Sequence, residues 1–174
     1  SAGSLGLPNK PRLKLTVAYV THDQAEALAV SDQIVVMNAG LIAQAGSPRE
    51  LYEHPNSEFV AGFMGEALLF AGIAQADGTV RLGPLQVPTR QPMRPGSVKV
   101  AVRPEAWTVV QSGTGGLEGQ LSKTAYLGGF QELTVSTEIG EIFVVSPDVG
   151  RAWAPGLALG LRLEGRGVSV VAAV

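Results

Sequence analysis

A single histidine near the start of the chain lies at a position where its side chain could contact a phosphate. His22 lies between an apolar run, residues 13–20, which predicts a buried strand, and a helix whose start the pair Thr21 and Gln24 predicts as a capping box. Open α/β folds gather ligands at the carboxyl ends of strands, beside the free N–H groups of helix starts. An imidazole there could donate a hydrogen bond to a γ-phosphate and orient attacking water. The same spacing fits a histidine that only caps the helix, and spacing alone favours that simpler interpretation.

Two charged residues, Arg103 and Glu105, flank a proline farther along the chain. A guanidinium and a carboxylate there could clamp a small anion or a neighbouring subunit, and an internal ion pair at a strand end fits equally well. Most aromatic residues of this half, Tyr126 among them, are expected in the core or at an interface rather than as base-stacking platforms. Arg103, Glu105 and Tyr126 are therefore candidates for a regulatory or interface site.

Glu26 and His54 carry less weight as functional candidates. Glu26 follows His22 by four positions on the predicted helix, where a solvated or partner-facing role is simpler than that of a general base. His54 precedes a proline at a predicted helix end, where its charge would suit the helix dipole. With two distant histidines and no cysteine, the sequence predicts no metal site and excludes disulfides.

The first 65 residues predict a small α/β unit that positions His22. Beyond the strand and the capped helix, residues 34–37 and 41–45 predict a hairpin with a tight, glycine-containing turn. A serine-proline capping box then predicts a short helix that ends near His54, and residues 57–64 predict a second short helix.

From residue 66 onward the pattern changes to short apolar runs separated by glycine and proline. These runs predict strands at residues 68–75, 79–82, 98–102, 108–110, 117–126, 132–137, 141–145, 157–163 and 168–171. Such a series is typical of a small barrel or sandwich. We therefore expect a mainly β fold with a small α/β unit at its N-terminal side, divided near Gly65 into residues 1–65 and residues 66–174.

The composition excludes several classes of function. Net charge is -2, with 13 Lys plus Arg against 15 Asp plus Glu, and no basic cluster could follow a phosphate backbone, so nucleic acid is not an expected partner. The absence of cysteine fits a reducing compartment such as the cytoplasm. No apolar run reaches the ~20 residues that span a bilayer, and no signal-peptide pattern opens the chain, so any membrane association is expected through a partner.

Several segments closely resemble the ATP-binding subunits of ABC importers, the class that serves maltose, polyamines, sulfate and ferric iron. In the first half these are residues 19–28 (YVTHDQAEAL), 31–32 (SD), 35–40 (VVMNAG), 44–46 (QAG), 48–52 (PRELY) and 59–66 (FVAGFMGE). In the second half, residues 102–105 (VRPE) and 126–128 (YLG) resemble the OB-like regulatory region of those subunits, often called TOBE.

The resemblance implies a fold, a role for one residue, and partners. It implies an OB-like TOBE β-barrel over residues 66–174 and assigns His22 to the switch histidine that contacts the γ-phosphate of ATP. It further implies a homodimer bound to transmembrane permease subunits at the cytoplasmic face of the membrane, with ATP and Mg²⁺ in the whole subunit. The barrel would then stabilise the dimer or sense a regulatory signal.

The chain departs from that family by lacking the elements that hold nucleotide. It has no G-x-x-x-x-G-K-[ST] phosphate loop, no L-S-G-G-Q-type signature, and no apolar strand ending in Asp-Glu before Thr21. His22 alone cannot hold ATP and Mg²⁺, so we expect no cofactor and negligible ATPase activity for this chain by itself.

Two alternatives to the importer role remain open at this stage. The β domain could be an autonomous module for a small anion, or the chain could be a structural remnant without activity. The strand at residues 13–20 also raises a physical problem, because it would expose apolar faces without neighbouring strands. We expect dimerisation or strand exchange to cover it.

Overall fold

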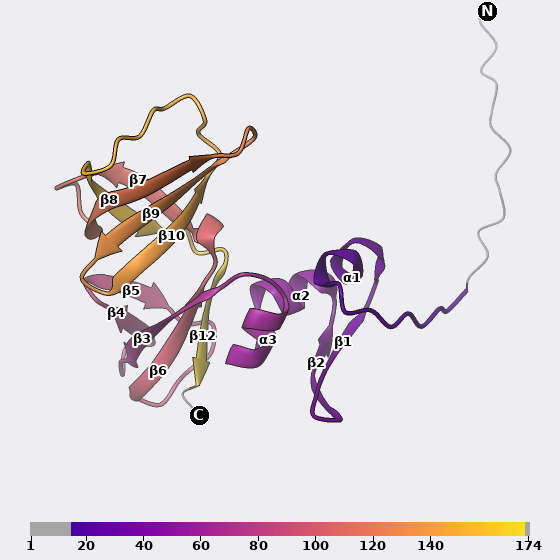
Figure 1. Cartoon of the computed structure of the whole chain (residues 1–174). Helices are drawn as coiled ribbons and strands as arrows, with labels where there is room; N and C mark the ends of the chain where they lie inside the picture. Colours follow the sequence, from indigo (N-terminus) through magenta and orange to yellow (C-terminus); the bar gives the residue numbers. More distant parts are fainter. Residues whose placement is uncertain (1–14, 173–174) are drawn as a thin grey trace, which may run out of the picture.

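The computed structural model describes residues 15–172, which form a small α/β unit followed by a β domain (Figure 1). The N-terminal unit contains α1 (Gln24–Val30), β1 (Ile34–Asn38), β2 (Leu41–Gly46), α2 (Pro48–Glu53) and α3 (Glu58–Phe63). The β domain contains β3 (Leu68–Ala74), β4 (Thr79–Leu82), β5 (Leu85–Pro88), β6 (Gly96–Val102), the 3-10 turn η1 (Pro104–Ala106), β7 (Trp107–Gln111), β8 (Leu117–Tyr126), β9 (Gln131–Thr137), β10 (Gly140–Ser146), β11 (Ala158–Leu163) and β12 (Val168–Ala172). The expected mainly β fold with a small α/β unit is confirmed.

The strand predicted at residues 13–20 is wrong for its described part. Residues 15–20 have no regular structure and are exposed, while residues 13–14 lie outside the described residues. A strand forms only when a neighbour satisfies its backbone N–H and C=O groups, and none of the described strands pairs with this segment. Apolar periodicity could not reveal that this neighbour is missing.

The β1–β2 hairpin confirms its prediction, including the tight turn. Asn38 pairs with Leu41, so the loop has two residues, Ala39 with φ 49° and Gly40 with φ 79°. Positive φ at both loop residues twists the chain in the sense that two-residue hairpins require.

Two short helices complete the N-terminal unit, as predicted, and a serine cap was predicted for the first of them. The Ser47 side chain accepts a hydrogen bond from the Glu50 N–H at 3.3 Å at the start of α2, and Ser57 does the same for Val60 at the start of α3. The hairpin and the helices share a small core of Ile34, Val36, Leu51, Val60 and Met64. The boundary predicted near Gly65 falls between α3 and β3, and it stays a prediction.

Two five-stranded sheets make up the β domain, which we also call the barrel, and enclose one core. Their strand orders are β12-β6-β3-β4-β5 and β10-β9-β8-β11-β7, with every pairing antiparallel. Alternate residues of both sheets point inward, for example Val100 and Leu133, which are fully buried. All nine predicted strands are confirmed within two residues at each end, and β5, a four-residue strand that ends in proline, was not predicted.

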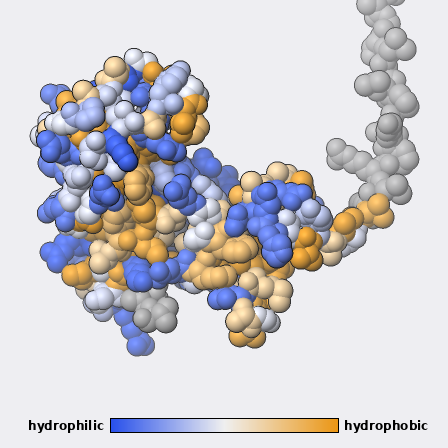
Figure 2. Space-filling model, viewed as in Figure 1, coloured by the Kyte–Doolittle hydropathy of each residue, from blue (hydrophilic) through white to orange (hydrophobic). Residues whose placement is uncertain are grey.

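Apolar side chains remain exposed on the N-terminal unit (Figure 2). On the hairpin they are Val35, Met37, Leu41 and Ile42, with exposed fractions of 54–75%. The segment before α1 adds further exposed apolar residues, including Val17 and Val20. Within residues 15–172, no helix is long and apolar enough to cross a bilayer.

Candidate functional site

His22 lies exposed directly before α1, but it does not cap the helix. The cap is Asp23, whose Oδ1 accepts a hydrogen bond from the Glu26 N–H at 3.1 Å. The predicted capping box of Thr21 and Gln24 is therefore wrong by two positions, because α1 begins at Gln24 and Thr21 Oγ1 instead accepts from the Asp23 N–H at 3.0 Å. Because Asp23 caps α1, His22 does not have the helix-capping role that its sequence position favoured.

Glu26 is occupied by local hydrogen bonds. Its two carboxylate oxygens accept from Tyr19 Oη at 2.8 Å and from Thr21 Oγ1 at 3.0 Å. The hydrogen bond to Glu26 is the main reason that the pKa of Tyr19 is raised. These contacts attach the segment before His22 to α1, so Glu26 has a local structural task.

Arg103 is buried and joins the β domain to the N-terminal unit, with an exposed fraction of 2%. Its Nε and one terminal nitrogen donate to the Tyr52 carbonyl at 3.2 and 3.0 Å, and the other terminal nitrogen donates to the Glu66 carbonyl at 3.1 Å. The guanidinium also lies 3.8 Å from the centre of the Tyr52 ring, a cation–π contact. Of the alternatives for Arg103, the ion pair with Glu105 is not among the salt bridges of the described residues, because three of its N–H groups bond to carbonyl oxygens, whereas a clamp for an anion or a neighbouring subunit stays a prediction.

Glu105 pairs with Tyr52 rather than with Arg103. The Tyr52 hydroxyl donates a hydrogen bond to Glu105 Oε1. Burial, followed by this hydrogen bond and the Glu105 charge, raises the pKa of Tyr52 to about 12. Burial also disfavours the charged form of Arg103, and for a cation this lowers the pKa. Arg103, Tyr52 and Glu105 thus form one cluster, which we call the clasp.

Further contacts between the two parts surround the clasp. Glu53, at the end of α2, is buried and accepts from Arg166 Nε at 2.9 Å and from Arg49 Nε at 3.1 Å. These bonds, with that from Arg49 as the main cause, lower the pKa of Glu53. The Glu53 carbonyl accepts from Ser169 Oγ at 3.0 Å. Sequence reasoning missed Tyr52 and Glu53, and the only local signal was the spacing of Arg49 and Glu53 by four residues on one helix.

Tyr126 lies apart from the clasp, at the tip of the β8–β9 hairpin that projects from the barrel (Figure 1). Its side chain is 68% exposed, and Leu127 and Phe130 beside it are 50% and 38% exposed. Gly128, with φ 84°, gives the turn a conformation that favours glycine. The tip therefore presents apolar groups to its surroundings, as the interface prediction requires.

His54 ends α2 through its backbone, and the helix-dipole role predicted for its charge stays a prediction. Its N–H donates to the Glu50 carbonyl at 2.8 Å to close α2, and its carbonyl accepts from Gln44 Nε2 at 3.0 Å. The imidazole contacts the Arg90 guanidinium.

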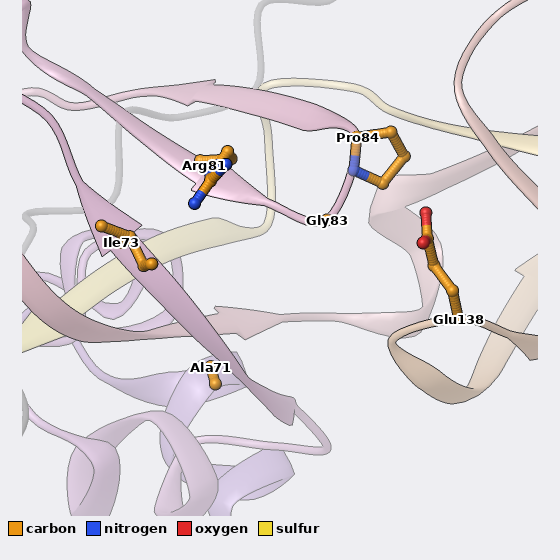
Figure 3. Close-up of a pocket in the computed structure, with 6 residues that line it drawn as sticks. All are labelled: Ala71, Ile73, Arg81, Gly83, Pro84 and Glu138. Carbon is orange, nitrogen blue, oxygen red and sulfur yellow. The ribbon is translucent and has the colours of Figure 1, made fainter.

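Two surface hollows of the β domain lack the features of an anion site. One, of about 470 Å³, is lined by Arg81 of β4 and by Glu138 of the β9–β10 turn, on opposite sides of the Gly83–Pro84 turn (Figure 3). The other, of about 450 Å³, holds Lys123 together with the carboxylates of Glu66 and Glu132. Each hollow has one cation and at least one carboxylate, so neither favours the anion-binding alternative.

Comparisons with known proteins agree with the resemblance in the sequence. Residues 100–171 match the family model of the TOBE domain. The chain is 49% identical over 166 residues to "Fe(3+) ions import ATP-binding protein FbpC 1" of Rhizobium meliloti, covering 92% of this chain and 47% of that protein. It is 43% identical to the FbpC protein of Rhizobium etli with the same coverage, and 41% identical over 138 residues to that of Vibrio cholerae, covering 76% of this chain and 39% of that protein. The chain thus spans about half the length of the curated relatives it matches.

Among solved structures, the cytoplasmic molybdate-binding protein ModG aligns with 59% of this chain and 94% of its own, with a TM-score of 0.47 and 16% identity. A likeness this distant carries no argument about function.

Proposed function

We propose that this chain, which carries a TOBE domain and is related over 92% of its length to Fe(3+) import ATP-binding proteins, acts as the C-terminal part of an ABC importer ATPase. The observation that carries the proposal is that the sequence similarity to these proteins extends over 92% of the chain. It leaves at most 8% of the chain unmatched, so it includes both His22 and the barrel. In such a subunit the parts that hold nucleotide would come from outside these 174 residues.

His22 is the proposed switch histidine of the complete subunit. Its side chain is exposed beside the helix start, and Asp23 rather than His22 caps α1. The imidazole is therefore available to donate a hydrogen bond to the γ-phosphate and to orient the attacking water. ATP and Mg²⁺ would be bound by a phosphate loop and acidic ligands that this sequence does not contain.

The barrel is the proposed dimerisation and regulatory module. The exposed tip formed by Tyr126, Leu127 and Phe130 offers apolar surface to a second copy of the chain. The resemblance adds transmembrane permease subunits as partners, which would hold the protein at the cytoplasmic face of the membrane. Because the relatives are named for Fe(3+) import, ferric iron is the substrate that we propose for the complete importer.

Two measurements on this chain test the proposal. We expect no turnover of Mg²⁺-ATP, because the phosphate loop is missing, and we expect a dimer by size-exclusion chromatography with light scattering. A variant with Leu127→Ser and Phe130→Ser should shift the dimer toward monomer, whereas Leu157→Ser, which changes a similarly exposed apolar residue elsewhere on the barrel, should not. Genuine ATP turnover, or a monomer at high concentration, would contradict the proposal.

A further inference from the structure

The two parts of the molecule are joined by contacts of very different burial. Lys99 of β6 meets Glu58 of α3 at 2.6 Å, but both side chains are more than 40% exposed. Arg166 meets Glu53 from a side chain that is 78% exposed. The exposed Lys99–Glu58 pair contributes little to a fixed geometry because water and salt screen it, and in the Glu53 pair only the carboxylate is buried while the arginine remains in solvent.

Arg103 differs because its whole guanidinium is enclosed between the two parts. Its exposed fraction is 2%, and its hydrogen bonds end on the Tyr52 carbonyl of α2 and the Glu66 carbonyl of the connecting segment. The planar fork fixes the directions of these bonds, and the Tyr52 ring covers one face of the guanidinium. Any movement of α2 relative to η1 must therefore break several bonds at once.

The end of α2 is also linked to the helix that follows His22. Leu51, which immediately precedes Tyr52, is fully buried in the small core. Ala27 and Leu28 of α1 pack against that same core. Since α1 has no fully buried residue of its own, these partial contacts are its main attachment to the rest of the unit.

We propose that Arg103 is a positioning residue that ties the placement of His22 to the barrel. The link runs from Arg103 to Tyr52, through the small core that contains Leu51 to Leu28, and along α1 to its first turn beside His22. A signal that moves the barrel, such as a change at its dimer surface, would reach the histidine by this route. The catalytic importance of the link rests on the role proposed for His22, whereas the link itself is a property of this chain.

Hydrogen–deuterium exchange and NMR on the full 174-residue chain test the link. Arg103→Met removes the guanidinium and keeps most of the apolar stem. We expect amide exchange in α1 and α2 to accelerate about tenfold or more, because separating the parts no longer breaks buried charged hydrogen bonds. Exchange in the barrel strands β8 and β9 should stay close to that of the wild type. The amide signals of residues 22–26 should shift, although they lie far from residue 103 in the sequence.

The matched control is Arg151→Met. Arg151 lies 4.0 Å from the centre of the Trp153 ring, so this variant removes an arginine–aromatic contact of the same kind within the barrel. It should leave exchange in α1 and α2 and the signals of residues 22–26 unchanged. Arg103→Lys keeps the charge without the planar fork and should give an intermediate change; it also replaces Arg103→Met in the comparison if that variant does not fold.

The proposal is wrong if the Arg103 variants accelerate exchange equally in the barrel and the helices, since that pattern indicates a general loss of stability. It is also wrong if residues 22–26 give unchanged signals. These outcomes do not depend on nucleotide. If the link is absent, His22 can still act as the switch histidine, and if His22 proves dispensable for ATP hydrolysis, the link can still be observed.

Discussion

Replacing Tyr52 by phenylalanine should remove much of the alkaline sensitivity of this protein. The Tyr52 hydroxyl is half-buried and donates to Glu105, and its pKa rises from 10.0 to about 12 on folding. Because the native state holds this proton more tightly than the unfolded state, the stabilisation is fully present below pH 10 and is lost as the pH rises toward 12. The rise corresponds to at most about 2.7 kcal/mol, of which about 1.4 kcal/mol should be lost by pH 11.

Urea unfolding of the wild type and Tyr52→Phe between pH 8 and pH 11.5 measures what the Tyr52 hydroxyl contributes to the free energy of unfolding. At pH 8 the variant should be less stable by about 0.5–1.5 kcal/mol, the usual contribution of one hydrogen bond, because the exposed Glu105 carboxylate can return to water. As the pH rises, the two free energies of unfolding should converge and then cross. Other tyrosines and lysines titrate in both proteins, so the difference isolates Tyr52. Parallel curves over the whole range would refute the reasoning.

Two further predictions concern acid stability and packing. The pKa of Glu53 is lowered mainly by its hydrogen bond from Arg49, so its contribution to stability is present at neutral pH and is lost as the pH falls through the folded pKa. Glu53→Gln should therefore flatten the decline of the urea unfolding midpoint between pH 6 and pH 3. An unchanged decline would contradict this prediction. Gly119→Ala would place a Cβ atom 2.5 Å from Val135 Cγ1, so it should lower the free energy of unfolding by about 1–3 kcal/mol, measured by thermal unfolding. The control Gly129→Ala, whose Cβ would have no atom within 4 Å, should lower it much less. Similar losses for both variants would contradict this prediction, because they would show that the strand relaxes freely.

The sequence predicted most of the β domain because glycine and proline separate its short apolar runs, and some strands, such as β3 and β9, alternate between core and surface. Residues 117–126, for example, were predicted with the bounds that β8 has in the structure. The hairpin turn and the serine caps of α2 and α3 were predictable for a related reason, since their chemistry is local. The strand at residues 13–20 was not, because an apolar run indicates burial without showing whether a partner strand exists.

The candidate site was predictable in part. His22 was found through its surroundings in the sequence, and its exposure in the structure is compatible with the proposed role. The role of Arg103 could not be predicted, because its partner Tyr52 lies 51 residues away and the contact uses a backbone carbonyl, which any residue type supplies. The chemistry of the 102–105 segment suggested an anion, a neighbouring subunit or an ion pair, and only the contacts that Tyr52 makes with Arg103 and Glu105 in the fold show the clasp.

The most direct test of the proposed function is ATP hydrolysis by a full-length subunit that carries this sequence, with and without His22→Ala. We predict that the variant keeps its affinity for Mg²⁺-ATP, since other elements would bind the nucleotide, and loses hydrolysis by about 10²-fold or more, the scale of a positioned acid–base group. His54→Ala is the matched control and should keep full turnover. Hydrolysis at the wild-type rate by the His22→Ala subunit would contradict the account.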